Sequence, residues 1–209
     1  MRRCIVILVA LLIGATAYAG GGVPGVRTEW GVVAGVHHPL AKFNMGSSTA
    51  ELKANTGFAA GLHMGLRIVG ILGILGIQPE ILYSYNKIAL KDEKQKFNTD
   101  IKCNTLQVPL LVSLKAGLVR FNVGPVFTLM DNPTYLDRKG EKVMFGRVYP
   151  TVSYSAGVSV CLLRRLLIDA RVGGGFKAVE NCLSYDIAAE GEYIKTTMFN
   201  AQLKVGILF

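Results

Sequence analysis

The sequence predicts an all-β fold, an eight-stranded antiparallel transmembrane up-and-down β-barrel. Three observations predict it. The last segment, 199–209, alternates strictly between apolar and mostly polar side chains and ends on an aromatic residue. Seven earlier segments alternate in the same way, and the connections between successive segments alternate between long and short. The N-terminus has the pattern of an export signal.

The first 19 residues have the three regions of a secretory signal peptide. Arg2 and Arg3 precede an apolar core at 5–13, and Ala17-Tyr18-Ala19 supplies small residues for cleavage after Ala19. The core is too short to span a bilayer as a helix, which disfavours a membrane anchor. We therefore expect a signal peptide at 1–19, a single barrel domain at 20–209, and export to the outer membrane of a Gram-negative cell.

Composition agrees with a barrel. Hydrophobic residues make up 51% of the chain, yet 18% of its residues are charged and 24 are glycines. A helical membrane protein would concentrate its apolar residues in runs of about 20, whereas barrel strands carry only a weak alternating signal. The formal charge is 23 − 14 = +9, or +7 without Arg2 and Arg3. An exported chain meets no nucleic acid, so this charge predicts either ordinary loop and lumen charges or contacts with lipopolysaccharide phosphates.

The eight strands are predicted wherever apolar residues alternate with small or polar ones. One face of each strand is apolar, and the other carries most of the glycines and charges. Residues 66–77 form the longest apolar run after the signal peptide, but glycine recurs every third residue from Gly70, which favours a strand end, a turn and a strand start over a helix. In order, the strands are 27–37, 56–68, 77–90, 101–114, 118–129, 149–162, 165–177 and 199–209.

The connections alternate in length. Those after the first, third, fifth and seventh strands are long or polar, and those after the second, fourth and sixth are short. Bacterial barrels have long loops outside, short turns in the periplasm and both termini in the periplasm. A soluble β-sandwich has no reason to show this asymmetry. The long connections are 38–55, 91–100, 130–147 and 178–195.

The two faces are assigned from glycines, charges and aromatic residues. A face of glycines and charges suits a cramped interior, so the apolar face is expected to meet lipid. Aromatic residues on that face are expected to form two girdles at the membrane surfaces. The outer girdle would contain Phe58, Tyr85, Phe127, Tyr154, Phe176 and Phe199, and the periplasmic girdle Trp30, Phe121 and Phe209.

Charged and polar residues on the inward face are the candidate site. They could form a polar conduit or an acid–base site, but buried charges must be paired or hydrogen-bonded, which favours a salt-bridged plug in so narrow a barrel. Glu80 and Asp169 are each expected to serve two basic neighbours. This predicted lumen network comprises Glu29, His63, Arg67, Glu80, Gln107, Arg120, Asp169, Arg171 and Lys204.

No catalytic residue, cofactor or metal site is predicted. His37, His38 and His63 could suggest metal binding or a lipid-modifying hydrolase, but no spacing pairs them with Ser84, Ser153 or Ser155 as nucleophile and base. After cleavage an odd number of cysteines remains, Cys103, Cys161 and Cys182, which does not make a disulfide framework. Whether Cys103 and Cys182 pair is left open.

Several segments resemble the PorT-type outer-membrane β-barrel domain, often labelled "porin family". They are Gln78-Pro79-Glu80-Ile81-Leu82-Tyr83-Ser84, Leu106-Gln107-Val108-Pro109-Leu110-Leu111-Val112, Val123-Gly124-Pro125 and Leu167-Ile168-Asp169-Ala170-Arg171. The resemblance covers about 27–209, although Val172 stands where the family more often has an aromatic residue. It implies an eight-stranded barrel, and the name-giving member is associated with type IX protein secretion. The last strand is similar to the closing strands of such barrels, whose terminal phenylalanine is part of the signal read by the barrel-assembly machinery, here Phe199, Leu203, Val205, Ile207 and Phe209.

The expected function is that of a non-enzymatic barrel, a structural or partner-binding part of an outer-membrane assembly. A small-solute channel is the alternative, and a lipid-modifying enzyme is a third reading. Expected partners are outer-membrane lipid and lipopolysaccharide, the barrel-assembly machinery, and other outer-membrane or secretion proteins that would contact the loops, including the mixed-charge clusters 91–96 and 137–142.

Overall fold

The structure is a computed structural model that describes residues 26–44, 50–68, 75–92, 96–163, 165–183 and 192–209. The signal peptide expected at 1–19 lies outside these residues. No helix long and apolar enough to cross a membrane occurs within them.

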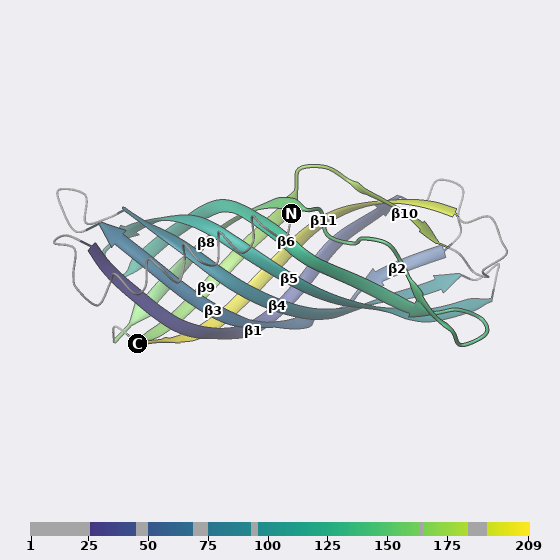
Figure 1. The fold of residues 1–209 in the computed structure, drawn as a ribbon, viewed down its shortest axis with the longest axis horizontal. Coiled ribbons are helices and arrows are strands. Elements are labelled where there is room, and N and C mark those ends of the chain that lie inside the picture. Colours follow the sequence, from purple (N-terminus) through teal and green to yellow (C-terminus); the bar gives the residue numbers. More distant parts are fainter. Residues whose placement is uncertain (1–25, 45–49, 69–74, 93–95, 164, 184–191) are drawn as a thin grey trace.

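The chain forms a closed antiparallel barrel of eight strands, as predicted (Figure 1). Each strand pairs with the next along the chain, and the first pairs with the last. The eight strands are β1 (Val26–Asn44), β3 (Gly57–Ile68), β4 (Leu75–Asp92), β5 (Phe97–Ala116), β6 (Val119–Leu136), β8 (Val152–Leu162), β9 (Leu166–Gly175) and β11 (Glu192–Leu208). Three short strands extend the sheet at one end: β2 (Ala50–Ala54) pairs with β4, β7 (Lys142–Met144) with β6, and β10 (Val179–Leu183) with β11.

The two ends of the barrel differ. We call the end where β1 begins and β11 ends the turn end, on the left in Figure 1. There Gly117, with a φ of 63°, supplies the left-handed residue of the β5–β6 turn, and the amide of Phe209 donates to the carbonyl oxygen of Trp30 over 2.7 Å. The opposite end, which carries β2, β7 and β10, is called the loop end.

The strands run further toward the loop end than the sequence suggested. The prediction of a charged loop at 91–100 was wrong for most of its length, because β4 and β5 stay paired as far as Asp92 and Phe97. Likewise β1 continues to Asn44, β6 to Leu136, and β11 starts at Glu192. Charged side chains can stand on the outer face of a strand without disturbing its backbone hydrogen bonds, so charge alone did not mark the strand ends.

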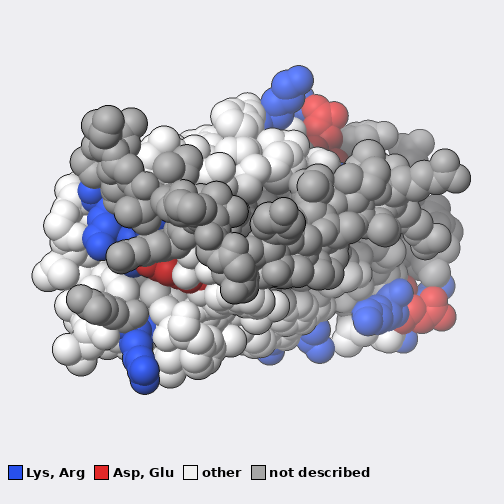
Figure 2. All heavy atoms as spheres, turned by 60° about the vertical axis from the view of Figure 1, so that its left-hand side comes forward, with Lys and Arg blue, Asp and Glu red and all other residues white. Residues whose placement is uncertain are grey.

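The predicted faces agree with the burial pattern. Apolar side chains between the two expected girdles point outward and are exposed, while the glycines and charges point inward. In Figure 2, which brings the turn end forward, most of the described surface is uncharged, and the acidic and basic side chains lie in small separate groups. The exposed outward residues include Trp30, Val32, Val36, Leu62, Ile81, Leu110, Val112, Val123, Phe127, Val158, Val172, Leu203, Val205 and Ile207.

Polarity reverses toward the loop end. Beyond Tyr85 on β4 the outward residues include Lys87 and Lys91, whereas the inward residues include Ile88 and Leu90, both fully buried. The paired part of β5 behaves in the same way, with Asn98, Asp100 and Lys102 outward and Ile101 and Cys103 inward. A strand that faces water outside and an apolar core inside has this pattern. The barrel therefore has an apolar outer band and, above it, a section built like a water-soluble barrel.

Close approach of neighbouring strands requires glycine at several inward positions. A Cβ atom at Gly61 on β3 would overlap the backbone carbonyl oxygen of Ile81 on β4. At Gly65, four residues along the same strand, an added Cβ would meet Glu29 only at 3.5 Å, an ordinary contact. The neighbouring backbone thus leaves room for a side chain at one position and not at the other.

We expect Gly61→Ala to lower the free energy of unfolding by about 1–3 kcal/mol, the usual cost of overpacking. Gly65→Ala is the matched control and should change it little. Urea unfolding in lipid vesicles, followed by the gel shift between folded and heated protein, measures both. Equal stability of the two variants would contradict the close approach of β3 and β4.

Candidate functional site in the barrel lumen

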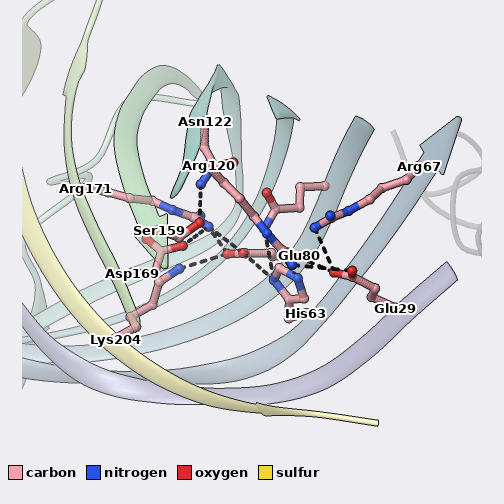
Figure 3. Close-up of polar contacts among 11 residues, drawn as sticks. Glu29, His63, Arg67, Glu80, Arg120, Asn122, Ser159, Asp169, Arg171 and Lys204 are labelled. Carbon is pink, nitrogen blue, oxygen red and sulfur yellow. Dashed lines mark hydrogen bonds and ion pairs between the residues drawn. The ribbon is translucent and has the colours of Figure 1, made fainter. Parts of the chain in front are cut away.

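The turn-end half of the lumen is filled around Glu80 on β4 (Figure 3). Its two carboxylate oxygens accept hydrogen bonds from Arg171 Nη1 and Nη2 on β9 at 2.8 and 2.6 Å, and from Lys204 Nζ on β11 at 2.9 Å. The ring of His63 on β3 lies 2.9 Å away through its Nδ1 atom. All four side chains are buried, with at most 1% of each exposed.

Asp169 balances the charge of this group. It accepts a second hydrogen bond from Arg171 Nη2 and is the register partner of Lys204 across β9 and β11. Two carboxylates, Glu80 and Asp169, thus face two basic side chains, Arg171 and Lys204, so the formal charges sum to zero. Since buried charges are tolerated only when paired and hydrogen-bonded, this neutrality lets the charges stay inside. We call Glu80, Asp169, Arg171, Lys204 and His63 the Glu80 cluster.

A second ion-paired group lies nearer the turn end. Glu29 on β1 accepts hydrogen bonds from Arg67 on β3 at 3.0 Å and from Arg120 on β6 at 2.8 Å. Its side chain is 24% exposed, unlike Glu80. Asn122 on β6 donates over 2.9 Å to the hydroxyl of Ser159 on β8, which is the register partner of Asp169. Side chains from opposite walls therefore meet across the lumen (Figure 3).

The structure brings together eight of the nine residues that the sequence singled out. Gln107 is the exception: it is inward and buried, but makes none of these contacts. Three further members were not singled out, Gln78, whose amide lies 3.3 Å from the His63 ring, and the pair Asn122 and Ser159. Gln78 and Asn122 share the inward parity of Glu80 and Arg120 on their own strands, and Ser159 shares that of the buried Ser153 and Ser155 on β8, so parity alone could have found them.

The loop-end half of the lumen is closed by apolar side chains. The chain between β6 and β8 turns into the barrel mouth and places Phe145, Val148 and Tyr149 there, each buried to 2% exposure or less. They pack against inward side chains of β4, β5, β6 and β11. We call this group the apolar plug: Ile88, Leu90, Phe97, Ile101, Cys103, Tyr135, Phe145, Val148, Tyr149 and Met198.

Hydrogen bonds hold the inserted segment in place. One carboxylate oxygen of Asp131 accepts from the backbone amides of Val148 and Tyr149, both at 2.7 Å. The Tyr149 hydroxyl lies 2.7 Å from His37 Nε2 and donates to Asn86 at 3.3 Å. Tyr149 therefore reaches from the loop end into the lumen as far as His37 and Asn86, and the segment 145–149 closes this end of the barrel.

Asp131 makes the attachment of this segment depend on pH. It follows the end of the outward apolar run of β6, and burial raises its pKa from 3.8 to about 6, although the two amides and Arg147 oppose the change. A raised pKa means that the folded state holds its proton more tightly than the unfolded state. Its contribution to stability is present below pH 3.8 and is lost as the pH rises through about 6.

We therefore expect Asp131 to make the urea midpoint of unfolding higher at pH 4.5 than at pH 7.5. The Asp131→Asn variant should lose the part of this pH difference that comes from Asp131. Urea titrations of both proteins at the two pH values measure it. An unchanged pH difference in the variant would show that Asp131 does not titrate in this range.

The histidines and cysteines have structural contacts. His37 lies against Tyr149 and His63 against Glu80, while His38 Nδ1 lies 2.8 Å from the Thr56 hydroxyl. None of the three rings contacts a serine hydroxyl in the described part of the chain, and no group of three metal-ligating side chains occurs there. Cys103 is a free thiol inside the apolar plug, where burial raises its pKa, and it forms no disulfide in this structure.

Comparison with known proteins identifies the fold. No family model and no curated protein matches the sequence. Among solved structures, the chain is similar to Neisserial surface protein A, with 17% identity and a TM-score of 0.51 over 88% of this chain and 97% of the other. It is also similar to the outer-membrane protein OprG of Pseudomonas aeruginosa, with 10% identity and a TM-score of 0.50 over the same shares. The chain thus has the fold of outer-membrane β-barrel proteins.

Proposed function

We propose that this chain is a non-enzymatic integral outer-membrane barrel with a closed lumen, acting as a structural or partner-binding component of an outer-membrane assembly. The observation that carries the proposal is the double closure of the lumen. The Glu80 cluster fills the turn-end half with neutralised charge, and the apolar plug fills the loop-end half. What remains available for binding is the outer wall, the rim and the loops.

The membrane location is supported by the outward apolar band and by the fold shared with outer-membrane proteins. Signal-peptide cleavage near Ala19 belongs to the same proposal. The motifs around Glu80, Gln107 and Asp169 support a relation to PorT-type barrels, and type IX secretion is accordingly a candidate pathway. The barrel-assembly machinery could read the exposed outer face of β11 and the residue that follows it, with Phe199, Leu203, Val205, Ile207 and Phe209.

Conductance in planar bilayers tests the closed lumen. The reconstituted barrel is expected to give no stepwise current. A variant that lacks residues 138–148 should also give no current, because the Glu80 cluster still fills the turn-end half of the lumen. Steady ion-conducting steps from the unmodified protein would overturn the proposal in favour of a small-solute channel.

Affinity purification from detergent-solubilised outer membranes tests the partner-binding role. A tagged chain is expected to retain a second outer-membrane or secretion protein in a fixed ratio. Purification as a lone barrel would contradict the assembly role and leave a barrel that acts alone. The non-enzymatic part is tested by mass analysis of lipid A after overexpression, where any new modification that disappears with Ser153→Ala or Ser155→Ala would overturn it.

A further inference from the structure

A basic groove lies on the outer wall directly above the apolar band. It has a volume of about 650 Å3 and is lined by residues of β4, β5, β6 and β7, most of them with outward side chains. Three lysines line it, Lys87, Lys102 and Lys142, against one carboxylate, Asp100, so the formal sum is 3 − 1 = +2. The groove is therefore positively charged at one height of the barrel.

Two of these lysines are placed where they repel each other. Lys87 on β4 and Lys102 on β5 are direct register partners, and their exposed side chains leave the sheet on the same face. Like charges directly opposite one another destabilise a pair of strands. No ion pair joins either ammonium group to a carboxylate of the described residues. An anion held between them would convert this repulsion into attraction.

Neutral side chains around the lysines are suited to the same ligand. Asn104, one pleat below Lys102, accepts a hydrogen bond from the Tyr83 hydroxyl over 2.6 Å. Its side-chain oxygen is thereby engaged, which leaves its amide nitrogen as a donor toward the groove. Lysine ammonium groups with an amide donor beside them make a set of donors that suits the oxygens of a phosphate group.

The height of the groove indicates the source of the phosphate. Tyr83 and Tyr85 form a ring cluster with Phe58, with centroid separations of 6.4 and 5.7 Å, at the upper edge of the apolar band. Lys87 follows Tyr85 by two residues on the same face, a rise of about 7 Å. Aromatic side chains of this kind lie at the membrane interface, so the lysines stand at the level of the lipid headgroups.

We propose that the groove between Lys87, Lys102 and Lys142 binds the phosphate groups of an anionic lipid headgroup in the outer leaflet. This site rests on the proposed membrane location and adds a lipid ligand to it. The exposed apolar wall below, with Ile81 and Leu110, would receive the acyl chains of the same lipid. The lipid would thus be held at one side of the barrel.

Native mass spectrometry of the barrel in neutral detergent provides the test. Bisphosphorylated lipid A and the same lipid after phosphatase treatment are added separately. The unmodified barrel should retain the phosphorylated lipid, and Lys87→Gln/Lys102→Gln should bind it about 10- to 30-fold more weakly, since each lysine near a membrane surface contributes a factor of about five. Lys142→Gln alone should give an intermediate loss.

Lys96→Gln is the matched control. Lys96 is an exposed lysine next to the start of β5, six residues before Lys102. Its substitution removes the same charge, but about 20 Å from Lys102 along the strand, on the side away from the membrane. Equal losses in the control and the double variant, or equal binding of the dephosphorylated lipid, would overturn the proposal. Displacement of the lipid by millimolar inorganic phosphate would overturn the lipid as the source. Because membrane fractionation and conductance are measured separately, failure of this site is distinguishable from failure of the barrel proposal.

Discussion

Glu80→Gln is expected to lower the free energy of unfolding of the barrel by about 3 kcal/mol. The substitution removes the carboxylate that serves Arg171, Lys204 and His63, and it leaves two buried cations facing Asp169 alone. Breaking a buried ion pair by removing one partner costs about 3–5 kcal/mol, because the remaining charge is uncompensated. The lower end of that range applies here because Asp169 still neutralises part of the excess charge.

Two further variants make this result specific. Glu180→Gln removes a carboxylate whose ion pair with Lys195 is more than half exposed, so its effect should stay below about 0.5 kcal/mol. Glu80→Gln/Lys204→Met removes one charge of each sign and should recover part of the loss. Urea unfolding of these three proteins and of the single variant Lys204→Met in lipid vesicles measures the differences. If the double variant is as unstable as the sum of its single changes, the two side chains do not interact as the structure shows.

Tyr149→Ala is expected to release the segment 145–149 from the barrel mouth while leaving the strands folded. The substitution empties a fully buried site in the apolar plug and removes the contacts with His37 and Asn86. Truncating a buried aromatic side chain costs about 3–5 kcal/mol. If most of that cost falls on the attachment of the segment, its opening should become roughly 100-fold more frequent.

Hydrogen exchange reports this opening directly. The amides of Val148 and Tyr149 bond to Asp131, so the peptide covering 143–151 should exchange much faster in the variant, whereas β5 and β6 should keep their protection. Met144→Ala is the control, since Met144 is an adjacent large apolar residue that is 61% exposed. Exchange that stays slow in Tyr149→Ala would mean that the hydrogen bonds to Asp131 hold the segment 145–149 without the Tyr149 side chain.

The alternation of side chains was enough to predict the barrel and its inner face. The inward position of residues such as Glu80, Arg120 and Lys204 follows from a period of two, and the number and pairing order of the strands follow from the count of such segments and the alternating lengths of their connections. Which of these residues would touch did not follow from it. Glu80 meets Arg171 because the lumen is narrow, and that pairing depends on the stagger of eight strands, which no single strand specifies.

The loop end was predicted poorly for a different physical reason. The rule that apolar faces point outward holds only within the apolar band, and it reverses beyond Tyr85. Ile88 and Leu90 also point inward, but they are apolar. A prediction that assigns polar residues to the interior therefore fails from this point of β4 onward. The insertion of Phe145, Val148 and Tyr149 has no periodic signal, because these residues belong to an irregular connection.

The composition of the Glu80 cluster has a consequence for the order of assembly. Glu80 is separated along the chain from His63 by 17 residues, from Arg171 by 91 and from Lys204 by 124. Lys204 lies on β11, the strand that closes the barrel by pairing with β1. A sheet that has not closed therefore contains charged side chains without their ion-pair partners. Such an intermediate is penalised in lipid and gains its full stability only on closure. The circle of strands should consequently form in a concerted, nearly all-or-none step, with incomplete barrels scarcely populated.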